Sequence, residues 1–200
     1  MIHTLPSVPE RRLALRLTPD ALRQVRSGHP WVYAEAITSV SDPDARPGTL
    51  AVVFDQKRRF AAIGLWDPDS PIRIRVLHAG DPMQIDSAFW DSRIRRAHLR
   101  RAGLVEAGTT GFRLLHGEND GTGGVVVDVY ERTAVVKLYS AAWFPHLDAL
   151  VGALESVAGF ERIVIRRARL VEALPAADRF GRADGTMLRG TTPSGPVLFS

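Results

Sequence analysis

Cysteine is absent from this 200-residue sequence, lysine occurs only as Lys57 and Lys137, and no apolar run is long enough to cross a bilayer. Without cysteine the chain has no disulfide, no thiolate metal site and no cysteine nucleophile. The first ten residues lack the hydrophobic segment of a signal peptide. We therefore predict a cytoplasmic protein that does not bind a membrane.

Arginine supplies nearly all of the positive charge, and the net charge is +4. Residues 1–100 hold 15 basic and 11 acidic side chains, whereas residues 101–200 hold 11 of each, so the whole excess lies in the first half. Arginine suits bidentate contacts with phosphate and stacking on bases. A biased genome composition also enriches arginine, so charge alone leaves a nucleic-acid partner open.

Residues 11–82 alternate short strand patterns with one helix. Thr18, Pro19 and Asp20 are typical of a helix start, and Ser27 and Gly28 of a helix end. Strand patterns occur at residues 13–17, 36–40, 50–55, 59–66 and 72–77. Short strands at this spacing predict a small closed or nearly closed β-barrel with one helix packed on it.

A basic face is predicted on this barrel, because Arg73 and Arg75 alternate with apolar neighbours in the last strand. Alternatives stay open: the two arginines could be the solvated side of an edge strand, Trp31 could be a core residue, and His29 could be structural. The candidate RNA-binding residues in this part are Arg26, His29, Trp31, Lys57, Arg58, Arg73 and Arg75.

Residues 83–190 are predicted to form a second, central α/β domain, an antiparallel sheet with helices on one face. Ser87 is the expected cap of a helix to about residue 101, whose arginine stripe, Arg93, Arg96 and Arg100, is either a phosphate contact or a solvated face. Three β-rich runs between residues 112 and 139 predict an antiparallel meander. A helix opening at Pro145 and a strand at residues 163–165 complete the layer. The fold class is thus α+β.

The polar turn at residues 116–124 has three interpretations. His116, Glu118 and Asp120 could ligate a metal, and the glycines could form a cofactor loop. Such a loop, however, should open a helix, and a valine-rich strand follows instead. Tight-turn chemistry, in which Asn, Asp and Gly supply positive φ angles, is favoured.

Two stretches carry a resemblance to a known family: residues 28–33 (GHPWVY) with 64–76 (GLWDPDSPIRIRV), and residues 113–121 (RLLHGENDG) with 124–130 (GVVVDVY). They resemble the N-terminal PUA domain and central domain of the bacterial S-adenosylmethionine-dependent methyltransferases that make 5-methylcytosine in large-subunit ribosomal RNA. One departure is Thr122-Gly123, where the family usually has an apolar residue and proline. The resemblance implies RNA binding by the first domain. It also implies a C-terminal Rossmann-like domain, absent from this chain, that binds S-adenosylmethionine, and a cysteine nucleophile that this chain lacks.

We therefore expect the RNA-recognition half of such an enzyme, which binds ribosomal RNA but is not catalytic by itself. No cofactor is expected in this chain, and S-adenosylmethionine is expected for the full-length parent. Residues 191–200 are expected to start a linker or hairpin toward a missing domain, since the sequence stops in a β-like run. A stand-alone RNA-binding or ribosome-assembly adaptor, a hydrolase that uses His116 or Glu118, and a homodimer all stay open.

Overall fold

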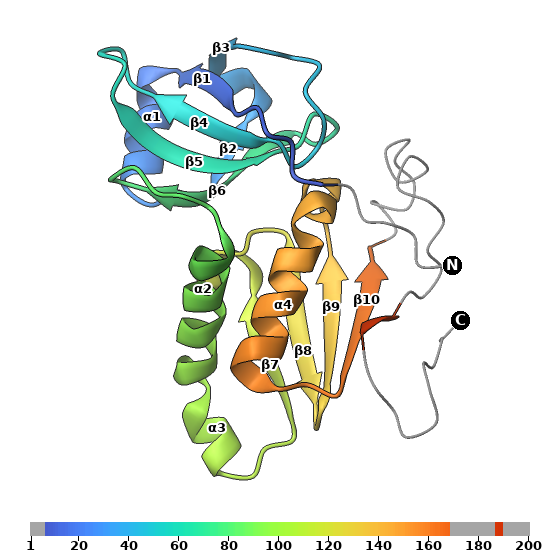
Figure 1. The fold of residues 1–200 in the computed structure, drawn as a ribbon. Helices are drawn as coiled ribbons and strands as arrows, with labels where there is room; N and C mark the ends of the chain where they lie inside the picture. The colour runs from blue at the N-terminus through green and yellow to red at the C-terminus, as the bar shows by residue number, and fades with distance from the viewer. Residues whose placement is uncertain (1–6, 169–186, 190–200) are drawn as a thin grey trace. The chain divides into compact units, whose positions relative to one another are not determined.

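The computed structural model describes residues 7–168 and 187–189, which form two units (Figure 1). One unit consists of residues 7–84 together with Ser140–His146, and the other consists of residues 85–139 and the described residues from Leu147 onward. The linker or hairpin predicted at residues 191–200 lies outside the described residues.

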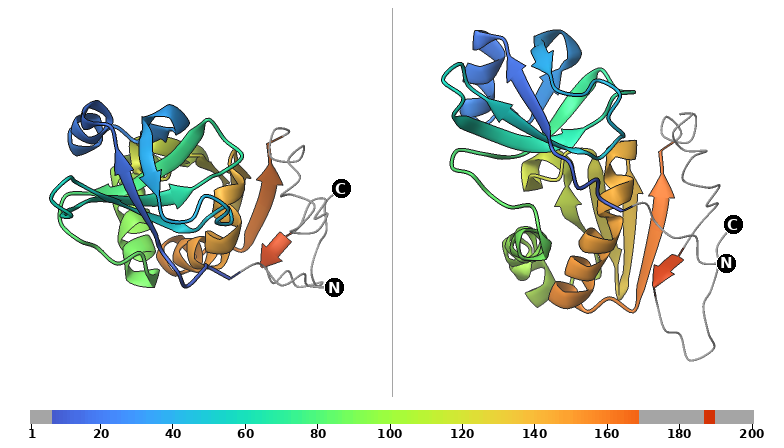
Figure 2. Two further views of the ribbon diagram at one scale, coloured as in Figure 1. Left: turned by 90° about the horizontal axis from the view of Figure 1, so that it is seen from above. Right: turned by 45° about the horizontal axis from the view of Figure 1, so that its top comes forward.

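The first unit is a curled six-stranded sheet (Figure 2). Its strand order is β2-β6-β5-β4-β1-β3, so β2 and β3 are the two ends of an open order, not partners in a closed barrel. All neighbours are antiparallel except β1 and β4, which are parallel. The strands are β1 Leu13–Leu17, β2 Trp31–Tyr33, β3 Ile37–Val40, β4 Leu50–Phe54, β5 Phe60–Trp66 and β6 Ile72–Ala79.

Helix α1 (Pro19–Arg26) packs on this sheet and has the predicted ends. The Thr18 side chain accepts a hydrogen bond from the Ala21 amide at 3.3 Å, and Gly28 has a φ of +97°. Val25 of α1 lies in the core with Leu15, Val32 and the other apolar residues of the strands. A 3-10 turn, η1 (Ala34–Ala36), joins β2 to β3.

Residues Ser140–His146 belong to the first unit, although they follow the last strand of the meander. Ser140 Oγ donates to Asp67 Oδ2 at 2.6 Å, and His146 Nε2 lies 2.8 Å from the Gly48 carbonyl oxygen. We had placed this segment in the central domain and expected a helix from Pro145. Instead, residues 141–146 form a 3-10 helix, η3 (Ala141–His146), and α4 (Leu147–Ala158) begins after it.

The second unit has a five-stranded sheet in the order β11-β10-β9-β8-β7. Its strands β7 (Gly111–His116), β8 (Val125–Tyr130) and β9 (Thr133–Leu138) pair antiparallel, which confirms the meander. Strand β10 (Arg162–Arg167) pairs parallel with β9, so the sheet is mixed and the prediction of an antiparallel sheet was wrong. Helix α4 lies between these two strands in sequence, and a helical crossover is what a parallel pair requires.

Helices α2 (Ser87–Arg100) and α4 pack together on one face of this sheet (Figure 1). The N-cap of α2 is Asp86, whose side chain accepts from the Phe89 amide at 2.9 Å, instead of the predicted Ser87. The remaining elements are α3 Ala102–Glu106, the 3-10 turn η2 Gly117–Asp120 and β11 Met187–Arg189. Within the described residues no helix is long and apolar enough to cross a membrane.

Candidate nucleic-acid interface

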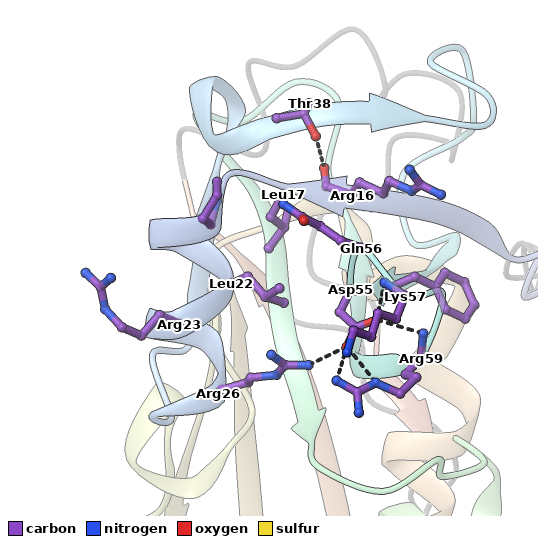
Figure 3. Close-up of a pocket in the computed structure, with 12 residues that line it drawn as sticks. Arg16, Leu17, Leu22, Arg23, Arg26, Thr38, Asp55, Gln56, Lys57 and Arg59 are labelled. Carbon is purple, nitrogen blue, oxygen red and sulfur yellow. Dashed lines mark hydrogen bonds and ion pairs between the residues drawn. The ribbon is translucent and has the colours of Figure 1, made fainter.

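A groove of about 740 Å³ opens on the first unit beside α1 (Figure 3). Strands β1 and β3, helix α1 and the turn between β4 and β5 supply its walls. Its lining residues are Arg16, Leu17, Pro19, Leu22, Arg23, Arg26, Thr38, Phe54, Asp55, Gln56, Lys57 and Arg59. Five of these are cationic and only Asp55 is acidic, which makes the groove strongly positive.

Asp55 organises the turn at the base of the groove, where it is 4% exposed. Its Oδ1 accepts from the amides of Lys57 and Arg59, both at 2.9 Å, and its Oδ2 accepts from Arg59 Nε and Arg26 Nη2, also at 2.9 Å. The Arg59 amide, followed by the two guanidinium groups, lowers the pKa of Asp55 well below its usual range, against the effect of burial. Asp55 is therefore a charged anchor that fixes two arginines from different elements.

Arg16 and Lys57 differ from Arg26 and Arg59 in that they do not pair with Asp55. Arg26 and Arg59 point toward Asp55, whereas Arg23 pairs with Asp20 on the outer side of α1 (Figure 3). Among the described residues, no carboxylate forms an ion pair with Arg16 or Lys57. Their charges are therefore available to an anionic ligand.

The structure places three of the predicted RNA-binding residues at or next to this groove. Arg26 and Lys57 line it, and Arg58 is exposed in the same turn with a φ of +61°. His29 and Trp31 lie at β2 instead, where the two rings meet edge to face at 6.1 Å and His29 Nδ1 is 3.0 Å from the Trp31 carbonyl oxygen. Contact with RNA stays a prediction for all five.

Arg75 does not lie on a solvated face. It is 6% exposed, and its Nη1 is 3.0 Å from Oδ2 of the equally buried Asp67. Arg73 bonds the carbonyl oxygen of Pro68, and its guanidinium lies 5.9 Å from the centre of the Trp66 ring. The alternation along β6 predicted that both arginines are exposed. Instead, Arg73 is half-buried, and Arg75 is buried because it pairs with the buried carboxylate of Asp67 in the preceding loop.

The three arginines of the stripe on α2 also differ in their contacts. Arg93 donates to the Gly121 carbonyl oxygen at 2.6 Å and lies over the Phe89 ring at 4.6 Å. Burial, with help from the charges of Arg96 and Arg100, lowers the pKa of Arg93 to about 10. Arg100 pairs with Asp120, and Arg96 is exposed. Of the three, Arg96 therefore has the position expected of a phosphate contact.

The polar turn at residues 116–124 is stabilised by hydrogen bonds to the buried carboxylate of Asp120. Asp120 is 4% exposed and accepts from the His116 amide at 2.7 Å and from Arg101 Nη1 and Nη2 at 2.8 and 2.7 Å. Burial would raise the pKa of Asp120, but the hydrogen bonds from Arg101 and Arg100 outweigh it and lower the pKa. Gly121 has a φ of +68°, as turn chemistry requires. The described residues contain no cluster of three metal-ligating side chains.

Sequence reasoning missed Arg16 and Asp55 as groove residues. The run Asp55-Gln56-Lys57-Arg58-Arg59 did contain a signal, because an Asp that begins a tight turn often accepts hydrogen bonds from the amides that follow it. Arg16 gave no such signal, since only the curl of the sheet brings β1 to the turn between β4 and β5.

Residues 15–79, which include every lining residue of the groove, match the family of the PUA-like domain. The chain is 43% identical to the ribosomal RNA large subunit methyltransferase of Deinococcus radiodurans over 199 residues, which are 97% of this chain and 48% of that protein. It is 30% identical to the ribosomal RNA large subunit methyltransferase I of Pseudoalteromonas translucida over 185 residues, 89% of this chain and 44% of that protein.

The chain is a homologue of the N-terminal part of these methyltransferases. It spans about half the length of the relatives it matches. A putative S-adenosylmethionine-dependent methyltransferase from Streptococcus mutans has a similar fold, with a TM-score of 0.71 at 14% identity over 90% of this chain and 43% of that one. The groove thus lies within the residues that match the PUA-like domain, and the second unit lies within the stretch that the chain shares with these relatives.

Proposed function

We propose that this chain is the RNA-recognition half of a class I S-adenosylmethionine-dependent large-subunit rRNA (cytosine-5) methyltransferase. In this proposal the chain binds ribosomal RNA and is not catalytic by itself. The similarity to rRNA methyltransferases over nearly the whole chain supports the substrate class. The PUA-like domain supports a role in binding rather than chemistry.

The groove on the PUA-like domain is the observation that carries the proposal. Two of its cations, Arg16 and Lys57, form no ion pair with a carboxylate of the described residues, and the carboxylate of Asp55 is already hydrogen-bonded on both oxygens. Arginines fixed in place lose little side-chain freedom when they bind phosphate, and the binding of each phosphate releases counterions from the RNA. The groove therefore fits an RNA backbone better than a neutral ligand.

Among the described residues, the glycine-rich turn at residues 116–124 has a cofactor-like composition but does not fit the methyl donor. It leads into β8 and not into a helix, so no helix N-terminus receives the ligand there. Arg93, Arg100 and Arg101 occupy the surroundings of that turn. In the related cytosine-5 enzymes the nucleophile is a cysteine, which this sequence lacks. We place the cofactor and the nucleophile in a Rossmann-like domain of the longer protein.

Binding to labelled transcripts that tile the large-subunit rRNA tests this function. At about 50 mM salt the full chain is expected to bind at least one transcript, and affinity is expected to fall steeply by about 200 mM salt. Incubation with the same transcript and tritiated S-adenosylmethionine is expected to leave the RNA unlabelled. Absence of binding at low salt, or methyl transfer by this chain alone, would contradict the proposal.

A further inference from the structure

One face of the second unit's sheet is not covered by α2 and α4. Along β8, Val125, Val127 and Val129 are buried on the helix side, while the alternate residues Val126, Asp128 and Tyr130 are half-buried or exposed. Strand β9 alternates in the same way. We call the second set of positions, on β7 to β10, the open face.

The strand register places the residues of the open face in cross-strand rows. One row runs His116, Val126, Lys137, Arg166, and the next runs Arg113, Asp128, Val135, Val164. A bulge in β7 between Arg113 and Leu115 keeps Arg113 and His116 on the same face. Cations from three strands therefore share one surface.

Lys137 and Arg166 are direct neighbours in adjacent parallel strands, which lie about 4.8 Å apart. Like charges this close repel each other unless an anion lies between them. Asp128 is the acidic residue of the two rows, and both of its oxygens are taken by Arg113, at 2.8 and 3.2 Å. Among the described residues, no carboxylate pairs with Lys137 or Arg166. Lys137 and Arg166 are therefore positioned to bind an external anion together.

Two exposed tyrosines border these cations. Tyr130 is 58% exposed and Tyr139 is 44% exposed, and the Lys137 ammonium lies 5.0 Å from the Tyr139 ring. The hydrogen bond with Asp128 raises the pKa of Arg113. Aromatic rings interleaved with cations are the surface chemistry that binds unpaired nucleotides.

We propose that the open face is a second RNA site, which binds a few unpaired nucleotides. Lys137 and Arg166 hold phosphates, and Tyr139 and Tyr130, at opposite ends of the β8–β9 strand pair, stack on bases. The inference rests on the proposed function, since it assumes that RNA is the partner of the chain. A duplex is disfavoured here because its bases are already stacked and their faces are hidden.

Two labelled RNAs test the site on the full chain: an unpaired 12-nucleotide oligoadenylate and a duplex of the same length. Tyr139→Leu is expected to weaken binding of the unpaired RNA by about fivefold or more and to change duplex binding by less than about twofold. Lys137→Gln is expected to weaken binding of the unpaired RNA and make its salt dependence shallower. Arg95→Gln and Leu104→Ala remove a cation and an apolar side chain exposed on helices of the same unit, and both should bind as wild type.

The same assay separates this site from the groove. If Lys57→Gln weakens binding while Tyr139→Leu and Lys137→Gln bind both RNAs as wild type, the open-face site is wrong and the proposed function stands. If wild type binds neither of these RNAs but binds an rRNA transcript, the open-face site is wrong and the proposed function stands; if it binds no transcript either, both proposals fall.

A crosslinking experiment uses the wild-type chain, so its result does not depend on whether a variant folds. Oligonucleotides with 5-bromouridine, irradiated on the wild-type chain, should crosslink to Tyr139 itself, located by tandem mass spectrometry within the tryptic peptide 138–162. Crosslinks confined to residues of the first unit, which include residues 140–146 of that peptide, would overturn the open-face site.

Discussion

Ser140 and Asp67 are 73 residues apart in the sequence, yet Ser140 Oγ donates to Asp67 Oδ2 at 2.6 Å inside the first unit. The same carboxylate oxygen is 3.0 Å from Arg75 Nη1, and all three residues are buried. The PUA-like domain is therefore completed by residues that come after the meander. A division of the chain at residue 82 would leave Asp67 without one of its two partners.

Asp67→Ala should destabilise the protein strongly, because it removes the carboxylate that pairs with the buried guanidinium of Arg75 at 3.0 Å. Loss of one partner of a buried ion pair costs about 3–5 kcal/mol. Ser140→Ala removes the hydrogen bonds of the hydroxyl with Asp67 and with the Ala142 amide and should cost about 1–3 kcal/mol. Urea unfolding measures both. Asp69→Ala, a neighbouring exposed position, is the control, and equal stability of the two aspartate variants would refute the structural role of Asp67.

Gly48→Ala should disturb the packing of η3. Gly48 has a φ of +84°, and an added Cβ would lie 2.6 Å from the Ala142 carbonyl oxygen and 2.7 Å from Pro145 Cγ. Gly80 has a φ of +115° but open space around it, so Gly80→Ala isolates the cost of the backbone angle. We expect a loss of about 3 kcal/mol for Gly48→Ala against about 1 kcal/mol for Gly80→Ala. Equal losses in thermal or urea unfolding would mean that η3 does not pack there.

The protein should lose stability in mild acid through His146. Burial lowers the pKa of His146, while its hydrogen bond with the Gly48 carbonyl oxygen raises it less. Because the folded-state pKa lies below the unfolded value of about 6.5, the contribution is fully present above that pH and is lost as the pH falls below it. The free energy of unfolding should therefore drop from pH 7.5 to pH 5.

Replacement of the histidine should reduce this dependence on pH. His146→Gln keeps a side-chain donor but cannot titrate, so it should show a smaller difference between pH 7.5 and pH 5. His78→Gln, the same substitution at a half-buried position of β6 outside η3, is the matched control. An unchanged difference in His146→Gln would exclude His146 as its source.

Local patterns predicted the elements that depend on local chemistry. Thr18 and Gly28 bound α1 as expected, and the alternating valines of β8 lie in a meander as expected. The parallel pairing of β10 with β9 could also have been predicted, since a helix separates the two runs in sequence.

Long-range contacts explain what the sequence could not predict. Asp67 precedes Arg75 by only 8 residues, but the contact that completes this buried site comes from Ser140, 73 residues beyond Asp67, so the place of Arg75 in an alternating strand suggested exposure. Likewise, Arg16 reaches the groove only because β1 pairs with both β3 and β4. The curvature of the sheet forms the groove, and the spacing of residues in the sequence does not encode that curvature.

The salt dependence of RNA binding tests the central claim most directly. The double variant Arg16→Gln with Lys57→Gln removes the two groove cations that are not anchored by a carboxylate, and Arg11→Gln with Arg12→Gln removes two exposed cations outside the groove. If phosphates bind in the groove, the plot of log affinity against log salt should be shallower for the first variant by about 1–2, with weaker binding at low salt. The second variant should match wild type. A slope and affinity that are the same for the groove variant and for wild type would contradict the account.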